Sequence, residues 1–359
     1  MIRNALVHLS NARTSGTADD LRVAVSDASV VRHWRLNINP LRITASIEQV
    51  EADLGAPGLH TDIAPIQLQP SARASPRVLL RACRPRQWSK NLLVFAAPCA
   101  AGVIDQPQVA ARAAGAFLVM CLLSSATYLV NDVRDREQDH RDPRKRSRPV
   151  AAGELSARTA LLLAATLAVA GVAAGTSISP GLGAVGCAYL ALTTSYSLWL
   201  RHVVVADILV IAAGFVLRAL AGGVATDIYL SRWFVMVTAS CAIFLVAAKR
   251  YAELRERSVS GSMRATLRHY SLGGLRLTLA TAATIMVVSY TGWAFTRPSH
   301  VLWYGLSIAP LLLWLVRYAN LIEAGAGQAP EELILGDRML LALGVTWSLL
   351  FLGGVYAGS

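Results

Sequence analysis

Apolar residues are unevenly distributed along this chain. They are concentrated after residue 90 in stretches of roughly 17–25 residues, and about 20 apolar residues are enough for a helix to cross the hydrocarbon core of a bilayer. Nine such stretches are expected to span a membrane, at residues 84–104, 109–131, 158–178, 181–200, 203–225, 231–249, 273–296, 300–318 and 337–357. The pattern therefore predicts an all-α fold, a polytopic membrane helical bundle of about nine transmembrane helices.

Residues 1–76 have a different pattern. They are mixed and polar, and they contain no apolar core of the kind that marks a signal peptide. We expect a poorly ordered cytosolic N-terminal extension or a small regulatory or docking element there, ahead of a transmembrane domain over residues 77–359.

Composition narrows the class of protein. The chain is 54% hydrophobic and 16% charged, which is too apolar for an ordinary soluble protein of 359 residues. The Lys and Arg residues that give the chain its net charge of +12 are grouped in loops between apolar segments. We therefore expect anionic lipids and phosphorylated substrates as partners, and no nucleic acid. The five cysteines form no CxxC or Cys/His cluster, which argues against a disulfide framework or a zinc site.

Basic residues also predict the orientation. They crowd the connections after the second and sixth predicted spans, whereas the alternate connections contain only Arg232 and Arg297. Short loops rich in Lys and Arg stay on the cytosolic side. We therefore expect a multi-pass protein of the cell inner (cytoplasmic) membrane, with its N-terminus and its charged loops in the cytosol.

The strongest chemical pattern is the run NDVRDREQD, which Asn131 opens at the end of the second predicted span. If the helix continues, Asp132, Asp135 and Asp139 fall on one face, and Tyr128 lies on the same stripe. Clustered carboxylates repel one another unless a cation joins them, and Mg²⁺ prefers oxygen ligands together with substrate phosphate. We expect Asp132 and Asp135 to bind Mg²⁺ with Asp139 in support; the alternative is a helix end that pairs with neighbouring arginines.

Basic residues flank this run on both sides. Lys145, Arg146 and Arg148 follow it and can clamp phosphate, although a positive loop also orients any membrane protein. Lys90 and Asn91 precede the first apolar run. They would enter the same cytosolic mouth if the first span packs beside the second.

Two ionisable residues lie inside the fifth predicted span. Asp207 and Arg218 are eleven residues apart and so share nearly one helix face, and buried charges of this kind usually face a cavity or a partner. At the end of the sixth span, Lys249 and Glu253 are one turn apart beside Arg250, and they either pair or face a shared substrate. Structural counter-charges and substrate contacts both remain open for these five residues.

These motifs resemble a known family. NDxxDxxxD followed by a basic loop ending RPVAAG is similar to the first signature of the UbiA superfamily of intramembrane prenyltransferases. The wider set resembles its decaprenyl-phosphate phosphoribosyltransferase branch over about residues 78–357, through RPRQWSKN, YLVNDVRDREQD, DPRKRSRPVAAG, AAKRYAEL and Gly336-Asp337-Arg338. Relatives usually carry a second aspartate-rich motif after the sixth helix, where this chain has KRYAE.

The resemblance implies a UbiA-like fold and a reaction. It implies Mg²⁺-dependent transfer of 5-phosphoribose from phosphoribosyl diphosphate to a polyprenyl (decaprenyl) phosphate, which feeds lipid-linked D-arabinose for a glycan of the cell-wall or nodulation-factor type. The three aspartates are then catalytic, and the substrate-contacting candidates are Lys90, Asn91, Tyr128, Asn131, Lys145, Arg146, Arg148, Asp207, Arg218, Lys249, Arg250 and Glu253.

Two other functions remain open. One is a UbiA-type prenyltransferase that moves a prenyl group from a prenyl diphosphate to a small acceptor, which predicts a second acidic cluster. The other is a transporter of anionic lipids, which would leave its substrate chemically unchanged.

Overall fold

The computed structural model describes residues 75–143, 145–199, 204–260, 270–296, 301–326 and 330–356, and within these ranges it contains helices and no strand. The predicted N-terminal extension lies outside the described residues, apart from its last two positions. The predicted all-α fold is confirmed.

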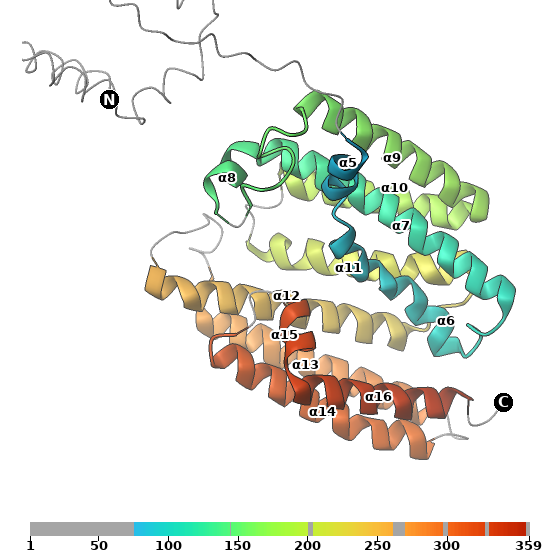
Figure 1. Ribbon diagram of the computed structural model, residues 1–359. Coiled ribbons are helices and arrows are strands. Elements are labelled where there is room, and N and C mark those ends of the chain that lie inside the picture. The colour runs from blue at the N-terminus through green and yellow to red at the C-terminus, as the bar shows by residue number, and fades with distance from the viewer. Residues whose placement is uncertain are drawn as a thin grey trace, which may run out of the picture. The chain divides into compact units, whose positions relative to one another are not determined.

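Eight long helices lie alongside one another in a bundle (Figure 1). They are α7 (Pro107–Arg134), α9 (Ala157–Ile178), α10 (Pro180–Leu198), α11 (Val204–Ala225), α12 (Arg232–Ser260), α13 (Leu272–Phe295), α14 (Val301–Glu323) and α16 (Arg338–Tyr356). The shorter elements are α5 (Pro76–Ala82), the 3₁₀ helix η1 (Pro85–Phe95), α6 (Ala96–Ala101), α8 (Arg136–Arg141) and α15 (Pro330–Gly336).

Among the described residues, seven helices are long and apolar enough to cross a membrane, namely α7, α9, α11, α12, α13, α14 and α16. Helix α10 coincides with the fourth predicted span but is not one of the seven. The first predicted span, residues 84–104, is not one continuous helix: η1 is followed by the six-residue α6, which ends at Gly102 in the left-handed conformation (φ 71°). The predicted count of nine full spans is therefore close but is not confirmed.

The burial of η1 follows its helical period. A 3₁₀ helix has three residues per turn, so positions three apart lie on one side. Asn91 and Val94 are buried, whereas Arg86, Ser89 and Leu92 are exposed. The buried side packs against α7 and α11.

Helix α11 joins two apolar cores. Ile208 belongs to the core between α11 and the later helices, whereas Ala221 and Ala225 belong to the core among η1, α7, α10 and α11. At Gly222, an added methyl group would overlap the carbonyl oxygen of Val94, so only glycine lets the two backbones approach this closely. Helix α11 is thus held between η1 and the second half of the bundle.

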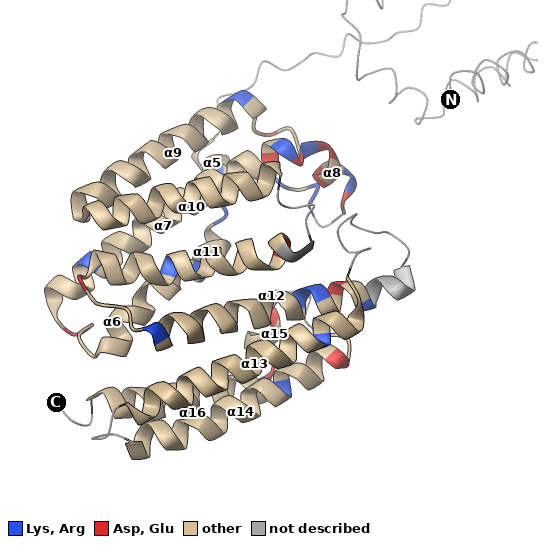
Figure 2. Ribbon diagram, turned by 180° about the vertical axis from the view of Figure 1, so that it is seen from behind, with Lys and Arg blue, Asp and Glu red and all other residues tan. Residues whose placement is uncertain are grey.

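Charged residues gather at one end of the bundle (Figure 2). Helix α8, the start of α11 and the last turns of α12 lie there, which we call the charged end. The two predicted groups of charged residues, after the second span and after the sixth, therefore meet at the same end of the molecule.

Candidate active site

Asp132 and Asp139 lie at the charged end and share a cation. Both carboxylates are buried, and Arg148 Nη1 lies 2.5 Å from Asp139 Oδ2 and 3.5 Å from Asp132 Oδ1. Arg84, which precedes η1, donates to the same Oδ1 of Asp132. Its guanidinium also lies 5.3 Å from the centre of the Tyr128 ring. The acidic motif and the residues just before η1 are thus brought together, as expected if the first span packs beside the second.

Asp132 has one carboxylate oxygen that is not used. Its Oδ2 is buried and has no hydrogen-bond partner among the described residues, and a buried charged oxygen without a partner is costly. Such an oxygen fits a divalent cation. Within the described residues no group of three or more His, Cys, Asp or Glu side chains is placed to hold a metal ion, so phosphate oxygens of a substrate would have to complete the coordination, as is usual for Mg²⁺.

Asp135 does not share a helix face with the other two aspartates. Helix α7 ends at Arg134, and Asp135 lies between α7 and α8 with φ −91° and ψ 10°. The expectation of one continuous helix over the three aspartates is therefore wrong, because this backbone turn carries α8 away from the axis of α7. The turn brings Asp139 back to Arg148 and leaves Asp135 in a separate place.

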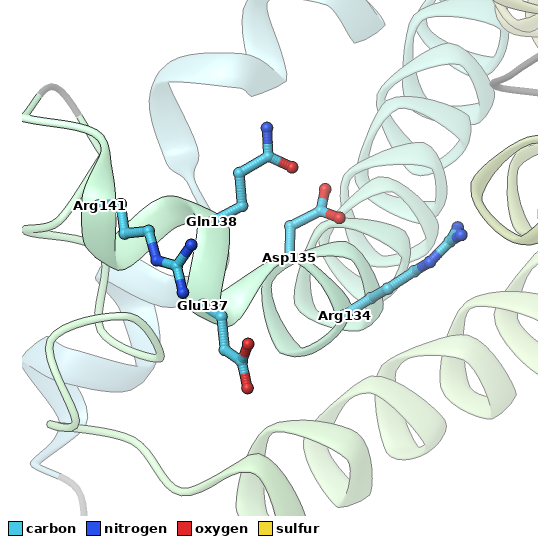
Figure 3. Close-up of a pocket in the computed structure, with 5 residues that line it drawn as sticks. All are labelled: Arg134, Asp135, Glu137, Gln138 and Arg141. Carbon is cyan, nitrogen blue, oxygen red and sulfur yellow. The ribbon is translucent and has the colours of Figure 1, made fainter. Parts of the chain in front are cut away.

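That place is an open hollow at the junction of α7 and α8 (Figure 3). It has a volume of about 330 Å³ and is lined by Arg134, Asp135, Glu137, Gln138 and Arg141. Neither Asp132 nor Asp139 lines it. The pairing of Asp132 with Asp135 as metal ligands stays a prediction, and the orphaned oxygen makes Asp132 the better supported of the two.

The remaining residues of this motif region have distinct surroundings. Asn131 Oδ1 accepts a hydrogen bond from Ser197 Oγ, which ties α7 to α10. Lys145 Nζ lies 3.8 Å from Asp139 Oδ1 and 3.3 Å from Asp142 Oδ2, whereas Arg146 is exposed. The basic loop therefore reaches the buried carboxylates through two of its three candidate residues, Lys145 and Arg148.

Another candidate, Arg218, lies deeper in the bundle. Arg218 is buried and donates from Nε to Asn91 Oδ1 at 2.8 Å, from Nη2 to Tyr189 Oη at 2.7 Å and from Nη1 to the Gly214 carbonyl at 2.8 Å. Its guanidinium also lies 5.3 Å from the centre of the Phe215 ring. Asp207 lies on the same helix but has different partners, Arg250 and Tyr196.

Asp207, Arg250 and Glu253 form a second, closed cluster at the charged end. Arg250 donates from Nε and Nη2 to the two oxygens of Asp207, at 2.5 and 2.9 Å, and from Nη1 to Glu253 Oε2 at 2.7 Å. Tyr196 Oη donates to Asp207 as well. Glu253 thus pairs with Arg250, whereas the sequence had suggested Lys249, which is half-buried.

A tyrosine next to this cluster stays neutral. Burial, followed by the charge of Asp207, raises the pKa of Tyr270 to about 12. Tyr270 lies just before α13, so the cluster draws on α10, α11, α12 and the connection to α13.

Sequence reasoning missed several contributors, chiefly Arg84, Tyr189, Tyr196 and Tyr270. Arg84 lies in the RPRQWSKN motif, and its pairing with Asp132 follows once that motif is placed beside the acidic run. Tyr189 and Tyr196 are polar groups in an apolar stretch, which is a signal that they need hydrogen-bond partners.

An apolar hollow of about 200 Å³ lies between α7, α9 and α10, with Thr127 and Val130 of α7 among its lining residues. At 3.6 residues per turn, these two positions lie roughly 140–160° around α7 from Asp132. The hollow therefore lies on the side of α7 that faces away from Asp132.

Comparisons with known proteins agree with this arrangement. The sequence pattern of the UbiA prenyltransferase family matches residues 92–357. The chain belongs to this family. A UbiA homolog from Archaeoglobus fulgidus bound to GPP and Mg²⁺ has a similar fold, with a TM-score of 0.60 and 18% identity over 78% of this UbiA-family chain and 98% of that one. This likeness confirms the predicted UbiA-like fold, and the chain is a multi-pass membrane protein.

Similar curated sequences include two mycobacterial enzymes named decaprenyl-phosphate phosphoribosyltransferase. The one from Mycolicibacterium smegmatis is 42% identical over 284 residues, which cover 75% of the UbiA-family chain and 89% of the relative. The one from Mycobacterium tuberculosis is 41% identical and covers 75% and 91%. The nodulation protein NoeC of Azorhizobium caulinodans is more distant, at 32% identity over 53% of the chain and 62% of that protein.

Proposed function

We propose that this UbiA-family chain transfers 5-phosphoribose from phosphoribosyl diphosphate to a polyprenyl phosphate such as decaprenyl phosphate, and so feeds lipid-linked D-arabinose for a cell-wall or nodulation-factor glycan. The names of two curated relatives support the reaction, at 42% and 41% identity over most of their lengths. The structural observation that carries the proposal is the buried Asp132 carboxylate, which lies beside two arginines and whose Oδ2 has no hydrogen-bond partner among the described residues.

In this proposal Asp132 offers Oδ2 to Mg²⁺, with Asp135 as the second ligand and Asp139 in support. When bound, the ion neutralises charge on the diphosphate and so supplies Lewis-acid chemistry. Arg84 and Arg148 hold the other oxygen of Asp132, so that Oδ2 is the atom left for the ion.

The rest of the reaction needs little from the protein beyond binding and orientation. The bond between ribose C1 and the diphosphate oxygen breaks, and an oxygen of the acceptor phosphate forms the new bond to C1. The acceptor is already anionic, so no general base is required. Lys90, Lys145 and Arg146 are proposed to donate to phosphate oxygens together with Arg148, because charge-assisted hydrogen bonds to phosphate are short and strong.

The closed cluster favours this reaction over prenyl transfer. A prenyltransferase with two acidic motifs would need a second set of carboxylates open to cations. Here Asp207 and Glu253 are present, but the guanidinium of Arg250 lies between them. A monophosphate acceptor requires cations and no second metal site, which is compatible with this arrangement.

We also propose that the charged end faces the cytosol at the inner membrane. The two connections rich in Lys and Arg, after the second and the sixth predicted spans, lie at this end. Short loops rich in Lys and Arg stay on the cytosolic side of a membrane. This side also gives access to soluble phosphoribosyl diphosphate.

The test is a transfer assay in membranes given radiolabelled phosphoribosyl diphosphate, polyprenyl phosphate and Mg²⁺. Wild type should label the lipid and release pyrophosphate, whereas Asp132→Asn should lose roughly 100- to 1,000-fold in rate, the scale seen when one charge-stabilising group is removed. Asp227→Asn is the matched control, because Asp227 is exposed, it follows the end of α11 that is remote from the charged end, and asparagine tolerates its positive φ of 55°.

Three other outcomes would contradict the proposal. Turnover of a prenyl diphosphate with a small acceptor, and none of phosphoribosyl diphosphate, would assign a prenyltransferase. Movement of unchanged lipid across the membrane would assign a transporter. Equal loss in Asp132→Asn and Asp227→Asn would remove Asp132 from the reaction.

A further inference from the structure

Arg218 is a buried cation whose partners are all neutral. It donates to the side chains of Asn91 and Tyr189 and to the carbonyl of Gly214, and its guanidinium lies 4.9 Å from the centre of the Tyr189 ring. Among the described residues, no carboxylate lies within salt-bridge distance of it. A charge this far inside a membrane bundle is costly, so its hydrogen bonds must do something that an apolar side chain cannot.

The bond to Asn91 fixes η1 against α11. Arg218 and Gly222 are one turn apart on α11, and they meet Asn91 and Val94, which are one 3₁₀ turn apart on η1. One contact is a directed hydrogen bond and the other is a close approach of two backbones. Together they fix both the rotation of η1 and its position along its axis.

The same side of η1 is also bonded to α7 in an ordered series, because Trp88 lies one 3₁₀ turn before Asn91. Asn91 Nδ2 donates to Ser124 Oγ at 3.2 Å, and Trp88 Nε1 donates to Ser125 Oγ at 3.1 Å. One turn before Trp88, Arg84 reaches Asp132. Any rotation or sliding of η1 would therefore move Arg84 relative to the carboxylate.

Arg84 has little freedom to compensate for such a movement. Its backbone is left-handed, with φ 55° and ψ 61°, a conformation that costs energy in residues other than glycine and persists only when its surroundings impose it. The next residue is Pro85, whose φ is fixed. The backbone position from which the Arg84 side chain reaches Asp132 and the Tyr128 ring is thus set by where η1 begins.

We infer that Arg218 is a positioning residue for the active site, which acts through Asn91, η1 and Arg84 to hold the Asp132 carboxylate with Oδ2 toward the site. Ser124 and Asp132 are eight positions apart on α7, about 12 Å at 1.5 Å per residue, so Arg218 acts from a distance. The inference rests on the proposed function only in that Asp132 binds a divalent cation.

Two substitutions of Arg218 separate positioning from direct binding of an anion. Arg218→Gln loses the charge but places an amide nitrogen where Nε donates to Asn91. Arg218→Lys keeps the charge but places its ammonium one bond further out and loses the planar fork. Positioning predicts that Gln retains function and Lys does not, whereas anion binding predicts the reverse.

The measurement is Mn²⁺ binding to purified full-length protein in the presence of inorganic pyrophosphate, followed by electron paramagnetic resonance. Arg218→Met and Arg218→Lys should weaken Mn²⁺ binding about tenfold, the scale found when a residue that orients a metal ligand is lost, and Arg218→Gln should stay within about threefold of wild type. Arg112→Met is the control, because it removes an exposed arginine paired with Asp227 and should leave Mn²⁺ affinity unchanged.

A double-mutant cycle gives the decisive outcome. If Arg218 acts through Arg84, then Arg218→Met adds little to Arg84→Gln; if the two act independently, their losses multiply. Multiplying losses, or a pattern in which Lys retains binding and Gln loses it, would overturn the inference and leave the proposed reaction standing. Failure of wild type to bind Mn²⁺ would instead overturn the metal site, and the inference would fall with it.

Discussion

Two pairs of carboxylates lie at the charged end, and they differ in how completely they are neutralised. Asp132 and Asp207 are equally buried, at 2% and 3% exposed. Both oxygens of Asp207 bond to Arg250, which is itself buried and also bonds Glu253. Asp132 instead accepts its bonds at Oδ1, from two arginines that are 22% and 29% exposed, and its Oδ2 has no partner in the part of the chain that the structure describes.

We interpret this difference as the distinction between a structural site and the proposed reactive one. A buried ion pair with every bond satisfied is costly to break and has little capacity for a ligand. A buried carboxylate with one unsatisfied oxygen is already partly prepared for a cation. The comparison thus explains how one end of the bundle can have two acidic clusters and only one candidate for metal chemistry.

The largest expected effect is on stability, at the closed cluster. Asp207→Asn leaves the buried guanidinium of Arg250 with one of its two carboxylate partners, and removal of one member of a buried pair costs about 3–5 kcal/mol. Asp132→Asn should cost far less in unfolding free energy while it lowers the transfer rate roughly 100- to 1,000-fold. Chemical unfolding in detergent, run beside the transfer assay, checks this crossed pattern; a stable Asp207→Asn protein without activity would place both carboxylates in the reaction.

A double substitution sharpens the same comparison. Asp207→Asn combined with Arg250→Gln removes both charges of the pair, so more than half of the stability lost in Asp207→Asn should return. Glu253, on the edge of the cluster, can then be solvated. Unfolding midpoints of the two single variants and the double variant give the coupling, and additive losses would show that the pair is not the source of the stability.

The bundle itself follows from the sequence, because the length and apolarity of a membrane helix are visible in the residues. The division of the first predicted span into η1 and α6 could not be predicted, because hydropathy does not distinguish a 3₁₀ period of three from an α period of 3.6. Asn91 and Val94 are buried by that shorter period.

The candidate site was only partly predictable. The acidic run and the basic loop could be found from their spacing. The pairing of Arg84 with Asp132 joins residues 48 positions apart, and no local pattern specifies it. No glycine or proline in the sequence around Asp135 indicates a turn there. The separation of Asp135 from Asp132 could therefore be seen only in the structure.

A moderate effect is expected at Arg148, which contacts both Asp132 and Asp139. Arg148→Gln removes the bond to Asp139 Oδ2 and the charge near Asp132, and a charge-assisted hydrogen bond to phosphate is worth enough to raise the KM for phosphoribosyl diphosphate about tenfold. Steady-state kinetics at saturating polyprenyl phosphate measure it. Arg146→Gln, in the same loop but exposed, should raise KM less; equal changes would mean that burial beside the carboxylates is unimportant.

The smallest effect is expected at a third carboxylate–arginine pair, Asp337 and Arg317, which is less buried than the other two and serves as the reference. Asp337 precedes α16. It accepts a hydrogen bond from Arg317 Nη2 at 2.7 Å and another from Leu340 N at 2.8 Å, and these bonds hold the pKa of Asp337 below its usual range.

A lowered pKa in the folded state means that the stabilisation is present above the unfolded pKa, about 3.9, and is lost as pH falls through the folded value. Asp337→Asn keeps an oxygen to accept from Leu340 N, but it removes the charge and the oxygen that accepts from Arg317 Nη2. The stability difference between wild type and Asp337→Asn should therefore be constant above about pH 5 and shrink below about pH 4, with transfer activity unchanged at neutral pH. Thermal unfolding across this range checks the sign, and a difference that grows toward low pH would show that the pair does not favour the ionised carboxylate.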